Sequence, residues 1–354
     1  MQKETMKALV YRGPGQYQLE DVAIPQIIEP TDVIGRVTIS TICSSDVHVL
    51  EGHMNNVSLP KIIGHEFCAE IVEVGSDVKE LKVGDRVQVM PGIYCGSCKF
   101  CKAGVAIMCE HKDAGVLGAN GVDGCQAEYV RVPLADKFCI KIPDGMEDED
   151  ILLLGDMMGT ARYGLENASF KAGQSLAVIG VGPVGLSTCL LAKKTYGARQ
   201  VIAIDIIQSR LDLALANGIA DVTLNPKDEN FVAKFMAATG GGVDAVIETA
   251  GTAQTLQMAF EMTRPGGIVS NVAVFPGPVE LPIPAITVKN ITFRSGIQFC
   301  EGVEEILQQI QSGKIDTRFM QTHRAPLNNI IEGYDIFGNH KDGCVKWLVT
   351  PYED

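Results

Sequence analysis

The sequence predicts two domains: a doubly wound parallel α/β domain, and a mainly β domain whose first part precedes it. Three observations support this. The chain has 354 residues, too many for one ordinary core. Residues 1 to about 150 form short apolar runs separated by glycines, which is typical of β-structure. From Gln174 onward, short apolar strands alternate with helical segments around a Gly-x-Gly-x-x-Gly turn.

The first region shows the two-residue period of strands. Val87 and Val89 are expected to face one way, with Arg86 and Gln88 facing the other. We predict strands at residues 7–11, 32–42, 66–74 and 85–90. Near residue 147 the pattern becomes apolar and helical, which marks the end of this β-region.

A dinucleotide-binding turn is predicted after the strand at residues 176–179. The segment Gly180-Val181-Gly182-Pro183-Val184-Gly185 follows that strand directly and opens a helix. Its glycines allow a tight turn and a close approach of the backbone to a pyrophosphate, which the helix N-terminus stabilises. The Gly-x-Gly-x-x-Gly pattern carries weight here because of the strand before it and the helix after it.

The next strand, residues 200–204, ends at Asp205, twenty residues after Gly185. Asp205 is expected to accept hydrogen bonds from the adenosine ribose hydroxyls and to repel a 2′-phosphate, so NAD is preferred over NADP. Arg210 lies five residues further on and would weaken the preference for NAD over NADP if it reached the cofactor. We expect Arg210 instead to be a solvated helix residue.

The alternation continues to the end of the second domain. Further strands are predicted at residues 244–248, 267–274 and 290–296, with a helix at 253–263 between two of them. We expect six strands with short crossovers, a doubly wound parallel sheet. A helix at 303–312 and a strand at 344–349 then return the chain to the first domain.

Half of a zinc site is predicted between Cys43 and His65, which are twenty-two residues apart. Cys43 ends an alternating apolar run, so we expect its thiol at the end of a strand, exposed by a loop. Thiolate and imidazole suit Zn²⁺, and a catalytic zinc takes three protein ligands. Asp156, set in an apolar segment, is the best third ligand, since a buried charge needs a partner or a metal. The alternatives are a structural Cys–His pair and a helix cap at Asp156.

A second zinc site is predicted from a C-x2-C-x2-C-x7-C run. Its four thiols are Cys95, Cys98, Cys101 and Cys109. Chance clustering is the alternative in a chain with eleven cysteines, and the spacing differs from that of ferredoxin iron–sulfur sites. A closed thiolate cage is a structural site, because no position is left for a substrate.

An open zinc site beside a dinucleotide site implies hydride transfer at an alcohol carbon. Ser45, two residues from Cys43, is expected to take the proton from the alcohol. His48 would then pass it through the cofactor ribose to water. Asp46 is expected to accept the second ring N–H of His65. The alternatives for Ser45 and His48 are an ordinary surface serine and histidine.

Together, Cys43, the Gly64-His65-Glu66 triplet, the four-cysteine segment and Gly180–Gly185 resemble the zinc-dependent medium-chain alcohol and polyol dehydrogenases across essentially the full chain. The resemblance implies a GroES-like mainly β catalytic domain at residues 1–155, a Rossmann domain inserted at 156–296 and a C-terminal return at 297–354. It further implies an active site in the cleft between the domains, Glu66 beside the metal as an exchangeable ligand, and a homotetramer or homodimer.

The position of Asp156 resembles the third ligand of bacterial secondary alcohol dehydrogenases, so the expected reaction is NAD-dependent interconversion of a secondary alcohol and a ketone. Those enzymes commonly lack the four cysteines and use NADP, so polyol, butanediol, threonine and steroid-type cyclic alcohol dehydrogenases remain alternatives.

By analogy with the same family, Val116, Leu117 and Ile297 are expected to line a roomy apolar substrate pocket. An alternative of another class is a non-catalytic nucleotide-binding redox sensor.

Composition excludes several partner classes. The formal net charge is −13, which opposes binding to nucleic acid or an anionic membrane. The N-terminus has no apolar segment of the signal-peptide kind, and no apolar run reaches the roughly 18 residues of a membrane span. We therefore expect a cytoplasmic protein without nucleic-acid or membrane partners.

Overall fold

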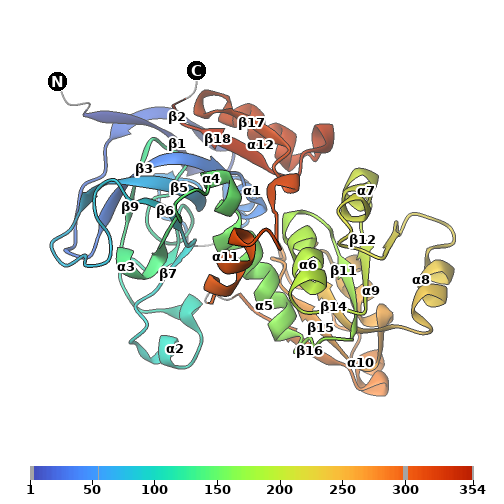
Figure 1. The fold of residues 1–354 in the computed structure, drawn as a ribbon. Coiled ribbons are helices and arrows are strands. Elements are labelled where there is room, and N and C mark those ends of the chain that lie inside the picture. The colour runs from blue at the N-terminus through green and yellow to red at the C-terminus, as the bar shows by residue number, and fades with distance from the viewer. Residues whose placement is uncertain (1–3, 55, 298–301, 353–354) are drawn as a thin grey trace. The chain divides into compact units, whose positions relative to one another are not determined.

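The computed structural model describes residues 4–54, 56–297 and 302–352 (Figure 1). The chain divides into two compact units. The first has the bounds Met1–Asp156 and Gln298–Asp354, and the second has the bounds Met157–Ile297. Over the described ranges, no helix is both long and apolar enough to cross a membrane.

The first unit is mainly β. Its largest sheet has the order β10-β6-β5-β3-β18-β17, with β9 also paired to β3. The bounds are β3 Val33–Thr41, β5 Glu66–Val74, β6 Arg86–Val89, β9 Tyr129–Val132, β10 Cys139–Lys141, β17 His323–Pro326 and β18 Trp347–Thr350. The smaller sheets are formed by β1 Thr5–Gly13, β2 Gln16–Ala23 and β4 Lys61–Ile62, and by β7 Gly92–Ile93 and β8 Gly115–Val116.

Short helices complete this unit. They are α1 Ser44–Leu50, α2 Lys99–Lys102, η1 Ala106–Met108, α3 Ala135–Phe138, α4 Asp148–Ile151, α11 Glu304–Gln311, η3 Arg318–Met320, η4 Leu327–Asn329, α12 Ile330–Gly338 and η5 Lys341–Gly343. A π-helical turn, η2 Leu154–Met158, follows α4. A cluster of buried apolar side chains joins α1, α12 and β18 through Val49, Leu50, Ile330, Phe337 and Trp347.

Strand register brings distant segments of the first unit to one end of the sheet. In the antiparallel pair β3–β5, Thr41 lies opposite Glu66. In the antiparallel pair β18–β3, Leu348 also lies opposite Thr41. The residues just after Thr41, just before Glu66 and just before Leu348 therefore lie close together.

The second unit is built on a parallel sheet with the order β13-β12-β11-β14-β15-β16, and every neighbouring pair is parallel. This confirms the predicted doubly wound α/β architecture. The strands are β11 Ser175–Ile179, β12 Gln200–Ile204, β13 Val222–Leu224, β14 Val243–Glu248, β15 Thr263–Asn271 and β16 Thr292–Ser295. The helices are α5 Gly159–Asn167, α6 Pro183–Lys194, α7 Gln208–Ala216, α8 Phe231–Thr239, α9 Ala253–Met262 and α10 Ile283–Lys289.

Strand β13 is the one strand of this sheet for which no bounds were predicted from the sequence. It has only three residues, and only Leu224 among them is buried, so its apolar pattern is too short to be recognised. Strand β15 begins at Thr263, before the predicted start at residue 267. The earlier start was not predicted because this part of the strand contains the segment Arg-Pro-Gly-Gly, and proline and glycine are depleted in strands.

The turn between β11 and α6 is close-packed. Gly180 has a φ of +84°, which favours glycine, and Pro183 occupies the first turn of α6. A Cβ atom at Gly185 would lie 2.0 Å from the carbonyl oxygen of Gly180. Gly185 therefore lets the first turn of α6 pack directly against the end of β11.

We expect Gly185→Ala to lower the free energy of unfolding by about 1–3 kcal/mol, because the added methyl group forces the turn apart. Gly277→Ala is the matched control, since a Cβ atom there meets nothing within 4 Å. Thermal unfolding of the two variants measures the difference. Equal midpoints would contradict the close packing of this turn.

Candidate active site

Cys43 caps the N-terminus of α1. Its backbone N–H donates to Asp46 Oδ2 at 2.9 Å, and the two residues form a capping box. The side chain of Cys43 is only 6% exposed. The expectation that a loop exposes this thiol was therefore wrong, since the chain turns directly from β3 into a helix whose first turn covers it.

His65 reaches two carboxylates, one through each ring nitrogen. Its Nδ1 lies 3.0 Å from Asp46 Oδ1, and its Nε2 lies 3.4 Å from Asp156 Oδ2. The preceding Gly64 has a φ of +100°, and a Cβ atom there would lie 2.6 Å from Gln126 Cγ. Only glycine suits that position, so the backbone itself sets the direction of His65.

Asp156 lies in the π-helical turn η2 and points toward Cys43 and His65. The cap interpretation is excluded, because Asp156 lies within the turn Leu154–Met158 and its carboxylate contacts these two distant side chains. Its Oδ2 atom is 3.5 Å from Cys43 Sγ. Single π-helical turns are common at functional sites, where the extra residue redirects a side chain.

These three side chains fit a zinc ion. Tetrahedral zinc bonds to sulfur, nitrogen and oxygen place neighbouring ligand atoms about 3.3–3.6 Å apart. The observed separations from Asp156 Oδ2 are 3.4 Å to His65 Nε2 and 3.5 Å to Cys43 Sγ. Glu66 offers a further oxygen in the same group, in which all ligand atoms lie within 4.8 Å of one another.

The charges of this cluster also favour a cation. Burial, followed by repulsion from Asp156 and Glu66, raises the pKa of Cys43 to about 11. Burial raises the pKa of Glu66 to about 7, although Lys346 opposes the shift. Buried acids packed this closely resist ionisation together, and a divalent ion would relieve their repulsion.

Lys346 is a buried cation that sequence reasoning missed. It is 0% exposed, pairs with Glu66 Oε1 and donates to the carbonyl oxygen of Ile42 at 3.0 Å. The second oxygen of Glu66, Oε2, is buried without a hydrogen-bond partner. A single lysine inside the apolar run Cys344-Val345-Lys346-Trp347 was the available signal, because a buried lysine needs a partner.

Gln126 and Tyr334, both buried and both missed from the sequence, hold Asp46 in place. The Tyr334 hydroxyl donates to Gln126 Oε1 at 2.6 Å, and Gln126 Nε2 lies 3.5 Å from Asp46 Oδ2. The other carboxylate oxygen of Asp46 faces His65. This chain of contacts places Asp46 at ion-pair distance from the His65 ring, although His65 Nδ1 makes no hydrogen bond of good geometry.

Ser45 and His48 lie three residues apart on α1, so their side chains share one helix face. Ser45 is half-buried, and its Oγ accepts from Cys43 Sγ at 3.7 Å. His48 is also half-buried, and its Nδ1 is buried without a hydrogen-bond partner. Burial, followed by the neighbouring His53, lowers the pKa of His48.

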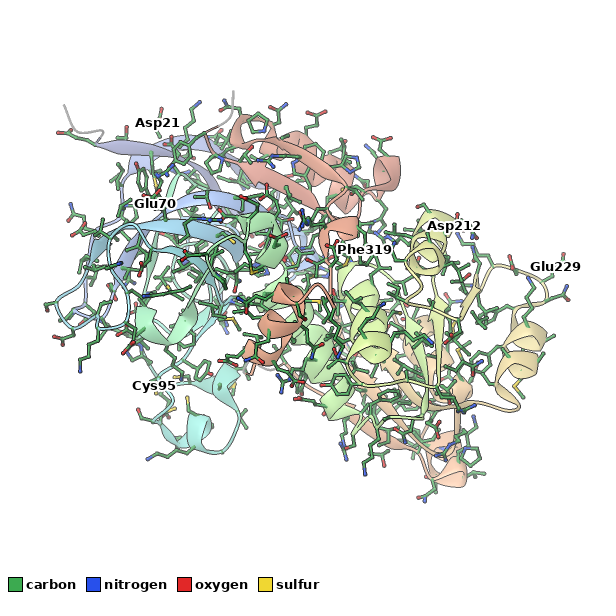
Figure 2. The ribbon with its side chains drawn as sticks, viewed as in Figure 1. Asp21, Glu70, Cys95, Asp212, Glu229 and Phe319 are labelled. Carbon is green, nitrogen blue, oxygen red and sulfur yellow. The ribbon has the colours of Figure 1, made fainter. Side chains whose placement is uncertain are left out.

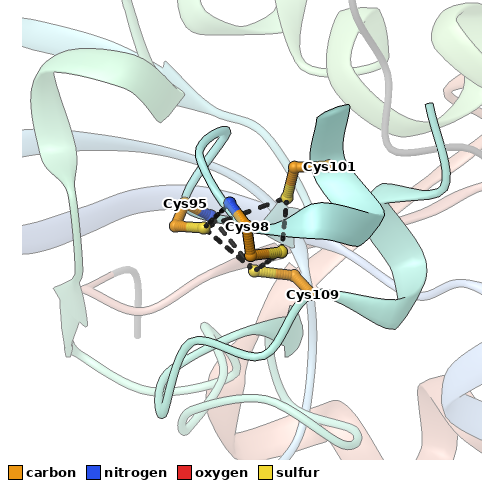
Figure 3. Close-up of side chains that lie close together, drawn as sticks. All are labelled: Cys95, Cys98, Cys101 and Cys109. Carbon is orange, nitrogen blue, oxygen red and sulfur yellow. Dashed lines mark hydrogen bonds between the residues drawn. The ribbon is translucent and has the colours of Figure 1, made fainter. Parts of the chain in front are cut away.

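The four predicted thiols converge in a separate lobe (Figure 3). Neighbouring sulfur atoms are 3.5 Å apart in the pairs Cys98–Cys101 and Cys95–Cys109, and 4.0 Å apart in the pairs Cys95–Cys101 and Cys98–Cys109. A tetrahedral Zn–thiolate cage requires about 3.8 Å. The four side chains therefore have the spacing of a structural zinc site.

Backbone amides support these thiolates. The N–H groups of Ser97 and Cys98 donate to Cys95 Sγ, and that of His111 donates to Cys109 Sγ. The Ser97 hydroxyl and the amides of Ser97 and Cys98 lower the pKa of Cys95 to about 5. Figure 2 labels Cys95 in this lobe, which is formed by loops and the single-turn helices α2 and η1.

We expect Cys98→Ala to remove one zinc ion per chain and to make the lobe sensitive to proteolysis, because little apolar core holds it. Cys189→Ala is the matched control, since Cys189 is buried in α6 and belongs to none of the candidate metal groups among the described residues. Elemental analysis of the purified variants measures the zinc. An unchanged zinc content in Cys98→Ala would contradict the structural site.

The dinucleotide turn has its acid and its basic residue side by side. Asp205 accepts from the backbone N–H of Val181 at 2.7 Å and from that of Ile207 at 2.8 Å. Arg210 Nη1 lies 3.9 Å from Asp205 Oδ2 and would lie 3.6 Å from a Cβ atom at Gly182. Arg210 is only 9% exposed, so its assignment as a solvated helix residue was wrong. Attraction to Asp205 holds it against the turn.

Comparisons with known proteins agree with this geometry. Residues 29–144 match the family described as alcohol dehydrogenase GroES-like domain, and residues 183–312 match the zinc-binding dehydrogenase family. An alcohol dehydrogenase of Cupriavidus necator is 36% identical, over 98% of this chain and 99% of its own length.

Solved structures agree as well. A Thermus sp. ATN1 alcohol dehydrogenase is 33% identical with a TM-score of 0.88, covering 98% of this chain and 99% of its own. A zinc-dependent alcohol dehydrogenase described as from Streptococcus pneumonia is 32% identical with a TM-score of 0.91, covering 99% of each chain.

Two further solved relatives carry cofactors. An Escherichia coli protein, 27% identical over 98% of this chain and 100% of its own, was solved with NADH at a TM-score of 0.89. A Sinorhizobium meliloti protein, 29% identical over 99% of this chain and 100% of its own, was solved with NADP at a TM-score of 0.86. Similar chains therefore bind either dinucleotide.

Proposed function

Because the chain belongs to the zinc-dependent medium-chain alcohol dehydrogenase family, we propose that it interconverts a secondary alcohol and a ketone at Cys43, His65 and Asp156, with NAD as cofactor. The family identified from the sequence is confirmed, and with it the class of enzyme and its dependence on zinc and a nicotinamide dinucleotide. The observation that carries the proposed site is the Cys43–His65–Asp156 cluster, whose spacing fits zinc.

In the proposed site, Cys43, His65 and Asp156 would hold the catalytic zinc, while Cys95, Cys98, Cys101 and Cys109 would hold the structural one. When bound, the catalytic zinc supplies Lewis acidity toward the alcohol oxygen and the dinucleotide accepts or returns a hydride. Asp46, 3.0 Å from His65 Nδ1, would favour the tautomer that leaves Nε2 free to bind the metal. The Lys346 pair draws one oxygen of Glu66 away, leaving Oε2 as an optional further ligand.

Proton transfer would run along one face of α1. The Ser45 hydroxyl, beside Cys43, takes the proton of the substrate alcohol and passes its own proton toward His48. The lowered pKa of His48 keeps its imidazole neutral and able to accept this proton at neutral pH. Ser45 and His48 thus connect the buried metal position to solvent.

A secondary alcohol is the proposed substrate because Asp156 supplies the third ligand, the residue that resembles those of bacterial secondary alcohol dehydrogenases. The three residues that were expected by analogy to line a roomy substrate pocket give less support to a secondary alcohol as substrate. Leu117 is 0% exposed, Val116 packs against the apolar core, and Ile297 is 52% exposed. A polyol, butanediol, threonine or cyclic alcohol is the alternative, and parallel assays of these classes with NAD⁺ and NADP⁺ would discriminate.

We expect NAD to be preferred over NADP, because Asp205 places a carboxylate beside the position of the ribose. Asp205→Ala should shift the ratio of kcat/KM values toward NADP by about 10- to 100-fold, since a like-charge contact is removed. Arg210→Ala is the opposing variant and should reduce whatever NADP activity the wild type has. An unchanged ratio in Asp205→Ala would contradict the assignment of this carboxylate.

Catalysis is distinguished from a nucleotide-binding sensor by Asp156→Ala. We expect this variant to lose turnover while its NADH affinity, measured by fluorescence titration, stays near that of the wild type. Asp144→Ala, at an exposed position twelve residues earlier, is the control and should be fully active. Full activity in Asp156→Ala would overturn the proposed site, and absence of turnover in the wild type across all alcohol classes would favour the sensor.

Assembly into a homotetramer or homodimer is proposed on the family resemblance, and a cytoplasmic location is proposed on the composition of the chain. Light scattering of the purified chain would test the first proposal.

A further inference from the structure

Helix α1 ends in a motif that brings two histidines together. The backbone N–H of His53 donates to the carbonyl oxygen of His48 at 2.8 Å, and that of Gly52 donates to Val49 at 3.0 Å. Gly52 has a φ of +77°. This is the Schellman pattern, in which the first and last of six residues meet, usually through apolar side chains. Here both positions carry imidazole.

The motif is held in place by its surroundings. A Cβ atom at Gly52 would lie 2.5 Å from Pro14 Cγ, so the turn packs directly against the β1–β2 connection. The backbone N–H of Gly15 in that connection donates to the carbonyl oxygen of Leu50 at 2.9 Å. The two histidines are therefore brought together by packed backbone.

The side chains converge. The rings of His48 and His53 are 5.8 Å apart between centroids, and Glu51 Oε2 lies 3.2 Å from His53 Nδ1. One ligand atom from each of His48, Glu51 and His53 can be chosen so that all three lie within 4.8 Å of one another. Two imidazoles and a carboxylate form a ligand set that zinc uses in enzymes.

A second observation points to a ligand at this place. His48 Nδ1 is buried without a hydrogen-bond partner, and such groups are uncommon unless something binds them. The lowered pKa of His48 keeps the ring neutral at neutral pH, which is the form that binds metals. His53 and Glu51 are about half exposed, with side-chain exposures of 46% and 54%, so an ion can reach the group from solvent.

We propose that His48, Glu51 and His53 form a third metal site, which binds a divalent transition-metal ion such as Zn²⁺ or Cu²⁺ and inhibits the enzyme when filled. Binding follows from the geometry alone. Inhibition rests on the proposed function, because an ion on His48 removes its imidazole from proton transfer. Cu²⁺ should bind more tightly than Zn²⁺, as expected for sites with nitrogen ligands.

The test adds Cu²⁺ to protein that already contains its two expected zinc ions, and records the electron paramagnetic resonance spectrum, zinc release and turnover on the same samples. We expect the wild type to bind one copper with nitrogen ligands, without losing zinc, and to lose activity in parallel. His53→Asn and Glu51→Gln should bind copper at least tenfold more weakly and keep their activity at the same concentration. His340→Asn is the control, since His340 is exposed and has a φ of +54°, which asparagine tolerates.

Equal copper affinity in His53→Asn and the wild type would overturn the third site. Copper binding that depends on His53 but leaves turnover unchanged would overturn the inhibitory role of His48 while supporting the site. If the wild type turned over no alcohol, the proposed function would fail, and the resonance spectra of the variants would still decide whether the site exists.

Discussion

The metal site depends on the pairing of β3 with β5 in a register that sets Thr41 opposite Glu66. That register, together with Leu348 of β18 opposite Thr41, brings the thiol of Cys43, the imidazole of His65 and the carboxylate of Glu66 together with Lys346, which lies 280 residues after Glu66 in the sequence. A slip of one residue would turn Glu66 to the other face of the sheet and would displace Cys43, His65 and Lys346, which lie just beyond the paired strand ends. The chemistry of the site is therefore inseparable from the packing of the first unit.

The metal site therefore holds three acidic side chains close together in the interior of the first unit. Cys43, Glu66 and Asp156 are packed together, and Lys346 pairs with only one of them, Glu66. Burial, with repulsion from Asp156, raises the pKa values of Cys43 and Glu66, so a further cation would be needed to ionise them together, while His65 already lowers the pKa of Asp156. The four-cysteine lobe differs, because its thiols are half-buried and backbone amides lower the pKa of Cys95. A divalent ion there would stabilise a lobe with little core, whereas an ion at the first site would also serve chemistry.

Local patterns allowed much of the fold and the site to be predicted. The parallel sheet followed from strands alternating with helices around Gly180–Gly185, and the cysteine group from its spacing. What the sequence concealed depends on long-range register or on packing. The partner of Lys346 becomes known only once β18 lies beside β3, and the roles of Gln126 and Tyr334 only once their contacts are known. The burial of Cys43 and of Arg210 was likewise missed, because helix α1 covers the first and attraction to Asp205 holds the second.

The central claim is that one ion is bound jointly by Cys43, His65 and Asp156. Diffraction from crystals of the purified protein, measured on both sides of the zinc absorption edge, tests it most directly. The account predicts an anomalous peak within bonding distance of Cys43 Sγ, His65 Nε2 and Asp156 Oδ2, and a second peak among the four cysteines. A fully occupied peak among the cysteines with none at the first position, or an ion there that Asp156 does not contact, would contradict it.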